Sequence, residues 1–361
     1  MARHLYVHIP FCPKACPYCS FYKEVGGRHQ AEAFLNALLA EAEAEAPGLH
    51  PETVFIGGGT PTSLTTRQLE FLISGLRSRV DFSKVQEFTI EMNPATVSLE
   101  KASSLLELGV NRVSMGVQSW EDSLLRTLGR AHTGLQAARS YATLREAGVA
   151  NINLDLMFGI PGQSESQWAG TLETTLALEP EHISAYCLTY EEDTEYLSRF
   201  SSGEFSPDAA RDAALFELAM DTLSESGFSQ YEISNYARPG RECLHNLGYW
   251  RGEDYAGLGP SAFSTREGTR WRNVADTSGY IQKSEQRLSL QDFSEEVTPS
   301  VRRAERIAFS LRTSDGISSD AADPRALAAL EANGLAVTEA SRVRLTRKGR
   351  LLADEIAAEL I

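Results

Sequence analysis

The chain has 361 residues, 42% of them hydrophobic, and its 49 acidic against 34 basic residues give a net charge of −15. This length allows one large domain with one or two smaller ones, and the acidity argues against nucleic acid or anionic membranes as partners. No apolar run approaches the roughly 20 residues that span a bilayer, so we expect no stable membrane insertion. The N terminus lacks the apolar core of a signal peptide, so we expect a cytoplasmic protein with reduced thiols.

Short apolar, β-branched runs alternate with longer helical patterns over the first half of the chain. The predicted strands are residues 5–9, 53–56, 88–92, 112–117, 151–157 and 183–188. The predicted helices are residues 31–45, 67–79, 98–108, 134–147 and 167–178. Because five of the six strands are followed at once by a helix, the order favours a parallel sheet with right-handed crossovers. The fold class is therefore α/β, and we expect an open (β/α)6 partial TIM barrel.

The pattern changes after about residue 190. Residues 208–226 form one helical stretch, and the aromatic, glycine-rich segment 231–271 indicates extended strand and loop. From about residue 300 the rhythm of helix, turn, β-wing and helix indicates a small winged-helix-like domain. A six-unit barrel has two open edges that something must cover. The expected domains are the barrel at 1–190, a covering α+β region at 191–295 and the winged-helix-like domain at 296–361.

Three of the five cysteines, Cys12, Cys16 and Cys19, fall within eight residues directly after the first strand. Three thiolates on a 4Fe-4S cluster leave one of its four irons without a protein ligand, and such an open iron can take a further molecule. The alternative is a zinc-stabilised binding module with His4 or His8 as the fourth ligand. Structural zinc sites usually close with a second ligand pair, which the two isolated cysteines do not form.

The polar residues of the barrel units gather where the predicted strands end. Glycines and Thr60 follow the second strand, Glu91 ends the third, Gln118 ends the fourth, and Asp155 lies in the fifth. The carboxyl ends of the strands in a βα barrel face one way and carry the site. We therefore expect these residues on the same face as the cysteine loop.

The run from Tyr6 to Cys19 resembles the radical S-adenosylmethionine superfamily. It is most similar to the branch that contains oxygen-independent coproporphyrinogen dehydrogenase and the HemW-type heme chaperones. The likeness continues in the family order through motifs at residues 57–62, 91–94, 114–119, 128–130, 153–161 and 245–250. The resemblance implies that Cys12, Cys16 and Cys19 hold a 4Fe-4S cluster, with S-adenosylmethionine at its open iron.

Further roles follow from the resemblance position by position. The positions that match contacts to the cluster-bound S-adenosylmethionine are Tyr6, Gly58 and Glu91. A second S-adenosylmethionine, as in the dehydrogenase, matches Gly59, Thr60, Gln118, Arg130 and Asp155, with Tyr18 close by. Taken alone, the glycines could equally be tight turns, and the polar residues ordinary barrel-layer residues. No catalytic residue is assigned.

Two departures separate the chain from the dehydrogenase. Phe21 stands where the dehydrogenase motif has a fourth cysteine, and the motif begins too close to residue 1 to leave room for the dehydrogenase's N-terminal extension. Both favour a heme chaperone that binds heme and transfers it to an acceptor protein. The alternative is oxygen-independent oxidative decarboxylation of coproporphyrinogen III to protoporphyrinogen IX. An electron donor is a further expected partner, and a homodimer stays open.

The resemblance also marks a heme-associated segment. Its candidate residues are Cys243, His245, Asn246, Tyr249 and Trp250. A neutral imidazole is a common axial ligand of heme iron, and aromatic rings offer flat apolar surface for a porphyrin. His245 could equally be a core histidine with both ring nitrogens satisfied, and Cys243 is the competing ligand.

Overall fold

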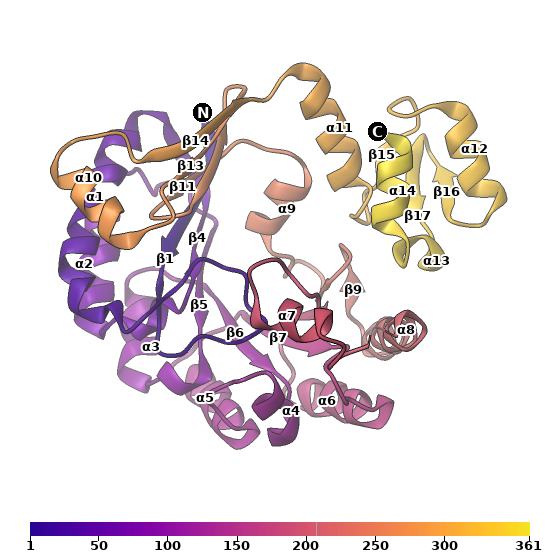
Figure 1. Cartoon of the computed structure of the whole chain (residues 1–361), viewed down its shortest axis with the longest axis horizontal. Coiled ribbons are helices and arrows are strands. Elements are labelled where there is room, and N and C mark those ends of the chain that lie inside the picture. Colours follow the sequence, from indigo (N-terminus) through magenta and orange to yellow (C-terminus); the bar gives the residue numbers. More distant parts are fainter. Residues whose placement is uncertain (207) are drawn as a thin grey trace.

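Six parallel strands form the wall of an open barrel in the predicted order. The computed structural model describes residues 1–206 and 208–361 (Figure 1). The six strands are β1 (Ala2–Ile9), β4 (Leu49–Gly58), β5 (Glu87–Met92), β6 (Arg112–Gln118), β7 (Ile152–Phe158) and β8 (His182–Cys187). The helices that follow them are α1 (Ala31–Glu45), α2 (Thr66–Arg77), α3 (Leu99–Glu107), α5 (Gly134–Glu146), α6 (Glu165–Ala177) and α8 (Ala209–Glu225). Each strand pairs in parallel with the next one in this order, with a register shift in the β1–β4 and β6–β7 pairs, and this parallel order confirms the α/β barrel prediction.

Later segments extend the sheet at both ends, to twelve strands in all. Strand β11 (Tyr255–Leu258) pairs with β1 in parallel. The antiparallel strands that continue that side are β12 (Phe263–Arg266), β13 (Thr269–Asn273) and β14 (Gln291–Glu296). At the other end, β10 (Asn235–Ala237) pairs antiparallel with β8, and β9 (Ser229–Gln230) follows. Neither β1 nor β8 is therefore left as an open edge.

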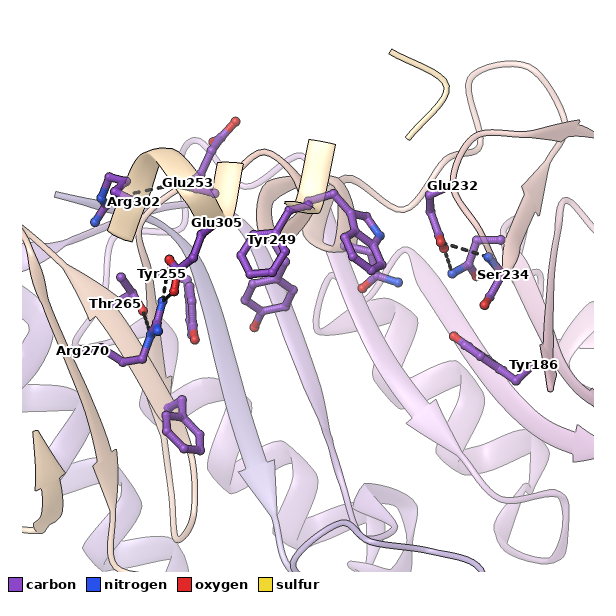
Figure 2. Close-up of a pocket in the computed structure, with 16 residues that line it drawn as sticks. Tyr186, Glu232, Ser234, Tyr249, Glu253, Tyr255, Thr265, Arg270, Arg302 and Glu305 are labelled. Atoms are coloured by element: carbon purple, nitrogen blue, oxygen red, sulfur yellow. Dashed lines mark hydrogen bonds and ion pairs between the residues drawn. The ribbon is translucent and has the colours of Figure 1, made fainter. Parts of the chain in front are cut away.

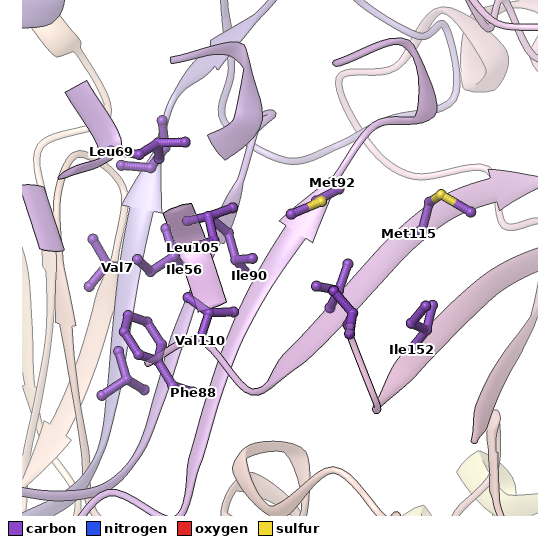
Figure 3. Packing of buried hydrophobic residues seen from close by; sticks show 14 of the residues in the cluster. Val7, Ile56, Leu69, Phe88, Ile90, Met92, Leu105, Val110, Met115 and Ile152 are labelled. Atoms are coloured by element: carbon purple, nitrogen blue, oxygen red, sulfur yellow. The ribbon is translucent and has the colours of Figure 1, made fainter. Parts of the chain in front are cut away.

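Alternation along the barrel strands separates a polar inner face from an apolar outer face. In β5, for example, Glu87, Thr89 and Glu91 alternate with Phe88 and Ile90, as the period of two requires. The outward residues pack against the surrounding helices as one large buried cluster, part of which is seen in Figure 3. The interior of the barrel is consequently available for ligands and is not the main hydrophobic core.

Several short elements complete the fold. They are β2 (Phe11–Cys12), β3 (Glu24–Val25), α4 (Asp122–Thr127), α7 (Glu195–Ser201), α9 (Leu244–Trp250) and α10 (Thr277–Glu285). The C-terminal elements are α11 (Pro299–Ser310), β15 (Ile317–Ser318), α12 (Pro324–Ala332), β16 (Ala336–Glu339), β17 (Arg342–Leu345), α13 (Arg347–Arg350) and α14 (Ala353–Leu360). These last elements share a separate hydrophobic cluster and lie to one side of the barrel (Figure 1). Across the described residues, no helix combines the length and apolar character needed to cross a membrane.

The prediction of strand and loop throughout residues 231–271 was wrong at α9. This helix has seven residues, and its N-cap residue Cys243 makes no side-chain capping bond. Its first amides instead donate to Glu87 of β5, from Leu244 at 2.7 Å and from His245 at 3.1 Å. Helices this short are marginal alone. The carboxylate that stabilises α9 lies 157 residues away in the sequence, so local pattern could not reveal it.

Candidate functional site

The three clustered cysteines lie in a loop that two short strands close at its base. Strand β2 pairs with β3 in parallel, so that Cys12 lies opposite Val25. All three thiols are free and partly exposed. Thr60 Oγ1 lies 3.5 Å from Cys12 Sγ, and Arg130 Nη1 lies 3.7 Å from Cys16 Sγ. Burial raises the pKa of the Cys12 and Cys19 thiols, and the polar groups of Thr60 and Arg130 lie beside the sulfurs. The loop has the donor set of an iron–sulfur site.

The zinc alternative asks for a histidine beside these thiols, and both candidate histidines are engaged elsewhere. His8 accepts from Tyr6 Oη at Nδ1 and donates from Nε2 to the Tyr22 carbonyl, both at 3.0 Å. Burial lowers the pKa of His8 to about 4. His4 contacts Thr53 and Glu253 at the opposite end of β1. Within the described residues, no three His, Cys, Asp or Glu side chains surround one metal position. The thiolates of a 4Fe-4S cluster bind different irons, so a cluster does not need them to converge on one point.

Gly58 and Glu91 form the next layer of the site, beside the cysteine loop. The Gly58 amide donates to Glu91 Oε2 at 3.1 Å. Gly58 has φ +109°, and a Cβ there would lie 2.6 Å from the His8 ring. A glycine is therefore required for both backbone angle and close approach. Burial, with the nearby Asp155, raises the pKa of Glu91 to about 8. This carboxyl is suited to an ammonium ligand, which would favour its ionised form.

Arg130 links the cysteine loop to the end of β6. Its Nη2 donates to the Gly116 carbonyl at 2.6 Å, while its buried Nε has no hydrogen-bond partner. Gln118, at the end of the same strand, has φ +69° after a register shift in the β6–β7 pairing. Asp155 accepts from Ser114 at 3.1 Å. An unpartnered guanidinium nitrogen beside these groups leaves a donor for a ligand.

The positions marked by the resemblance come together around two adjoining cavities. A cavity of 420 Å³ is lined by Tyr18, Gly58, Gly59, Thr60, Glu91, Gln118, Arg130 and Asp155. A second, central cavity of 470 Å³ contains Tyr6 and shares Gly58, Glu91 and Asp155 with the first. Phe21 lines both cavities and is 68% exposed. Both volumes are in the usual range for small-molecule sites.

Two of the heme-segment residues, His245 and Cys243, are buried, although His245 lines the central cavity. His245 is 1% exposed, with Nδ1 2.8 Å from Thr53 Oγ1 and Nε2 3.1 Å from Tyr249 Oη. Cys243 is fully buried, and its thiol donates to Glu87 at 3.3 Å. Burial raises the pKa of this thiol. In this conformation both ring nitrogens and the thiol are used inside the protein.

The other residues of the segment face a third cavity of 520 Å³, between the barrel and α11 (Figure 2). Its aromatic walls are Tyr186, Tyr249, Trp250, Tyr255, Phe263 and Phe309, and Asn246 also lines it. Arg270 and Arg302 lie at its edge and already have acidic partners: Glu295 and Glu305 for Arg270, and Asp254 for Arg302. This third cavity shares Tyr186, Asn246, Tyr249, Tyr255 and Phe263 with the central cavity. The cavities therefore adjoin one another between the cysteine loop and the aromatic walls.

Sequence reasoning missed the inward residues at the start of the barrel strands. Glu87 begins β5 and supports α9, and Arg112 begins β6 and lines the central cavity. His182 begins β8 and contacts Asn153 at 2.6 Å and Tyr231 at 2.8 Å. The signal that could have identified these inward residues is a charged or polar side chain at the start of a strand with alternating apolar residues.

Comparison with known proteins identifies the family. A profile of the Radical SAM superfamily matches residues 6–175. The chain is 38% identical to the heme chaperone HemW of Bacillus subtilis (strain 168) over 98% of both chains. It is 39% identical to the heme chaperone HemW of Escherichia coli (strain K12), over 72% of this chain and 68% of that protein.

A solved structure agrees with this result. The coproporphyrinogen III oxidase HemN from Escherichia coli, described as a radical SAM enzyme, superposes with a TM-score of 0.84 at 26% identity, covering 98% of this chain and 88% of that chain. The fold, the placement of the motifs and the full-length likeness to HemW proteins agree. The chain therefore belongs to the HemW family of the radical SAM superfamily.

Proposed function

We propose that this chain is a heme chaperone, which binds heme and transfers it to an acceptor protein. Relatives that match along nearly the whole chain bear that name. The observation that carries the proposal is the 520 Å³ cavity with aromatic walls from α9, α11 and the sheet. A planar, apolar macrocycle is well matched by such walls. Asn246, Tyr249 and Trp250 are the residues of the heme segment that would contact it.

The proposal assigns a 4Fe-4S cluster to Cys12, Cys16 and Cys19. Tyr6, Gly58 and Glu91 would hold S-adenosylmethionine at the open iron. When bound, this pair would supply one-electron chemistry. The protein's contribution is to place donors at the sulfurs, a carboxyl beside the ammonium and a glycine where the backbone comes close. The unpartnered Arg130 Nε and the 420 Å³ cavity beside it support room for a second such molecule.

His245 has a different place in this proposal from that of an exposed axial ligand. Its Nε2 would have to leave Tyr249 before it could bind iron. We therefore assign His245 and Cys243 to holding α9 against the barrel. His245→Ala is expected to keep the position of the Soret band of bound heme, while weakening binding through α9. A changed axial-ligand spectrum in this variant would instead make His245 the ligand.

Heme titration of the anaerobically reconstituted protein tests the function. Wild type should develop a saturable Soret band and pass heme to an apo-acceptor. Trp250→Leu should weaken binding roughly tenfold, because it removes an aromatic wall. Trp120 donates to Thr175 away from the aromatic cavity, so Trp120→Leu is the matched control and should bind as wild type. Equal affinities in all three proteins would contradict the site.

The oxidase alternative has its own readout. The likeness to HemN extends over 98% of this chain. Coproporphyrinogen III supplied with reductant and S-adenosylmethionine should stay unconverted. Formation of a product with vinyl groups would replace the chaperone proposal with the enzyme.

A further inference from the structure

Arg112 is a buried cation that makes no direct hydrogen bond or ion pair within the described part of the chain. Burial lowers its pKa, but the nearby Cys243, Glu87 and Asp155 outweigh burial and raise it. Arg112 is 2% exposed at the start of β6. Its Nε has no hydrogen-bond partner, and over residues 1–206 and 208–361 its guanidinium takes part in no hydrogen bond or ion pair. Arginine stays protonated in proteins. Burial of a charge without direct hydrogen bonds is costly, so this guanidinium is suited to an anionic ligand that can make them.

The two carboxylates that could pair with Arg112, those of Glu87 and Asp155, accept hydrogen bonds from other groups. Glu87 accepts the Leu244 and His245 amides and the Cys243 thiol. Asp155 accepts from Ser114 at 3.1 Å and from Asn153 at 2.7 Å. Neither forms an ion pair with Arg112. The protein itself therefore leaves the guanidinium fork free for a ligand.

Arg112 lines the 470 Å³ central cavity at a deeper level than the cofactor residues. The β5–β6 register pairs Arg112 with Thr89, and Ser114 with Glu91. Arg112 thus lies two residues, about 7 Å, below the level of Glu91. The hydroxyl of Thr89 is buried and also lacks a partner. This depth separates Arg112 from the cysteine loop, where the cluster and S-adenosylmethionine would be held.

The cavity leads from Arg112 to the aromatic walls. Tyr249, Tyr255 and Asn246 line both the central and the 520 Å³ cavity. A molecule that packs on these rings can therefore extend a side group toward Arg112. Burial and Asp155 raise the pKa of Glu91 to about 8, so without an ammonium ligand this carboxyl is mainly neutral at pH 7 and presents little repulsion there.

We infer that Arg112 binds a carboxylate of the molecule in the central cavity, and that this carboxylate is a propionate of heme. The inference rests on the proposed heme function. The guanidinium fork matches a carboxylate through two parallel hydrogen bonds, which lysine cannot reproduce. Arg112 would fix the orientation of the macrocycle, with this propionate directed into the barrel.

A thermodynamic cycle that changes Arg112 in the protein and the propionates in the ligand tests whether the two groups pair. Heme and heme dimethyl ester, in which both propionates are methylated, are titrated into wild type, Arg112→Gln and Arg112→Lys. Esterification should weaken binding to wild type roughly tenfold to a hundredfold, as expected for a hydrogen-bonded charge pair. Arg112→Gln should bind both ligands alike, and Arg112→Lys should retain only part of the discrimination.

The control is Arg199→Gln, because Arg199 lines neither the aromatic nor the central cavity and pairs with Glu195 and Glu204 at the surface. It should leave the discrimination between acid and ester as in wild type. If the Arg112 variants discriminate between acid and ester as wild type does, the inference about Arg112 is overturned, while the proposed heme function stands. A loss of S-adenosylmethionine binding in Arg112→Gln with heme binding unchanged would overturn it too, since the carboxylate would then be that of methionine.

Two further results also have a defined interpretation: misfolding of Arg112→Gln and absence of heme binding by wild type. If Arg112→Gln does not fold, as judged by its circular dichroism and melting profile, the comparison of Arg112→Lys with wild type decides. Unreduced discrimination in Arg112→Lys then refutes the inference. If wild type binds neither heme nor its ester, the proposed function fails, and this inference fails with it.

Discussion

The carboxylate of Glu87 should control whether α9 keeps its place against the barrel. It accepts two backbone amides at the N terminus of a seven-residue helix that has no side-chain cap of its own. Glu87→Gln keeps the size of the side chain but removes the negative charge and one acceptor oxygen. The amide group of glutamine would then face a backbone donor, which it cannot satisfy.

The expected loss follows from these contacts. A buried hydrogen bond to a charged group contributes about 1.5 to 3 kcal/mol, and a charge at a helix N terminus adds about 0.3 to 1 kcal/mol. One lost bond with the loss of charge therefore predicts a decrease of about 2 to 4 kcal/mol in the free energy of unfolding of the segment. Because α9 carries Tyr249 and Trp250, heme affinity should fall with it.

Hydrogen exchange at the amides of Leu244 and His245 measures this local effect, and urea unfolding measures the global one. Both amides should exchange faster in Glu87→Gln than in wild type. Glu204→Gln is the control: Glu204 forms an ion pair with Arg199 at the surface, and its loss should leave exchange in α9 and the urea midpoint unchanged. Unaltered protection of both amides in Glu87→Gln would refute the capping role.

Two further predictions concern the cofactor side of the barrel. With the pKa of Glu91 at about 8, an ammonium ligand must displace a proton, so affinity for S-adenosylmethionine should rise from about pH 6 to about pH 8, with proton release. Calorimetry in two buffers measures this, and an unchanged pH dependence in Glu91→Gln would exclude that carboxyl as the cause. Gly58→Ala places a Cβ 2.6 Å from the His8 ring at φ +109°. We therefore expect the free energy of unfolding to fall by about 1 to 3 kcal/mol and the variant to bind less iron on reconstitution. Gly162 has φ +78° with nothing within 4 Å, and Gly162→Ala should therefore keep its iron; equal iron content in both variants would contradict a role for close approach.

The regular part of the fold was predictable because each barrel strand combines β-branched outward residues with a following amphipathic helix. The prediction for residues 31–45 coincides with α1, and the six strands differ from their predicted ranges mainly at the ends. The strands that extend the sheet were less accessible. Strand β14 is exposed along its whole length and carries no apolar alternation. Its pairing with β13 is a long-range contact that local pattern does not encode.

The site was predictable to the extent that motifs fix chemistry. The cysteine loop follows a strand, Gly58 and Glu91 lie at strand ends, and Asp155 lies inside β7. A parallel barrel brings such carboxyl-end positions to one face. Arg112 belongs to the same alternation but stands at the start of its strand. Without the register of β5 and β6, its missing partner could not be recognised, because a lack of contacts is a property of three dimensions.

The heme segment illustrates the difference between the presence of a motif and its orientation. A loop would let every side chain turn toward a ligand, whereas a helix divides them between faces by the spacing of four residues. His245 and Tyr249 are four residues apart and contact each other, and His245 also contacts Thr53 of the barrel strand β4. Asn246 and Trp250 are also four apart and face the aromatic cavity. Tyr249, at the boundary between the two faces, both contacts the histidine and lines the cavity. In the proposed site, His245 would become an axial ligand only if its hydrogen bond to Tyr249 were broken.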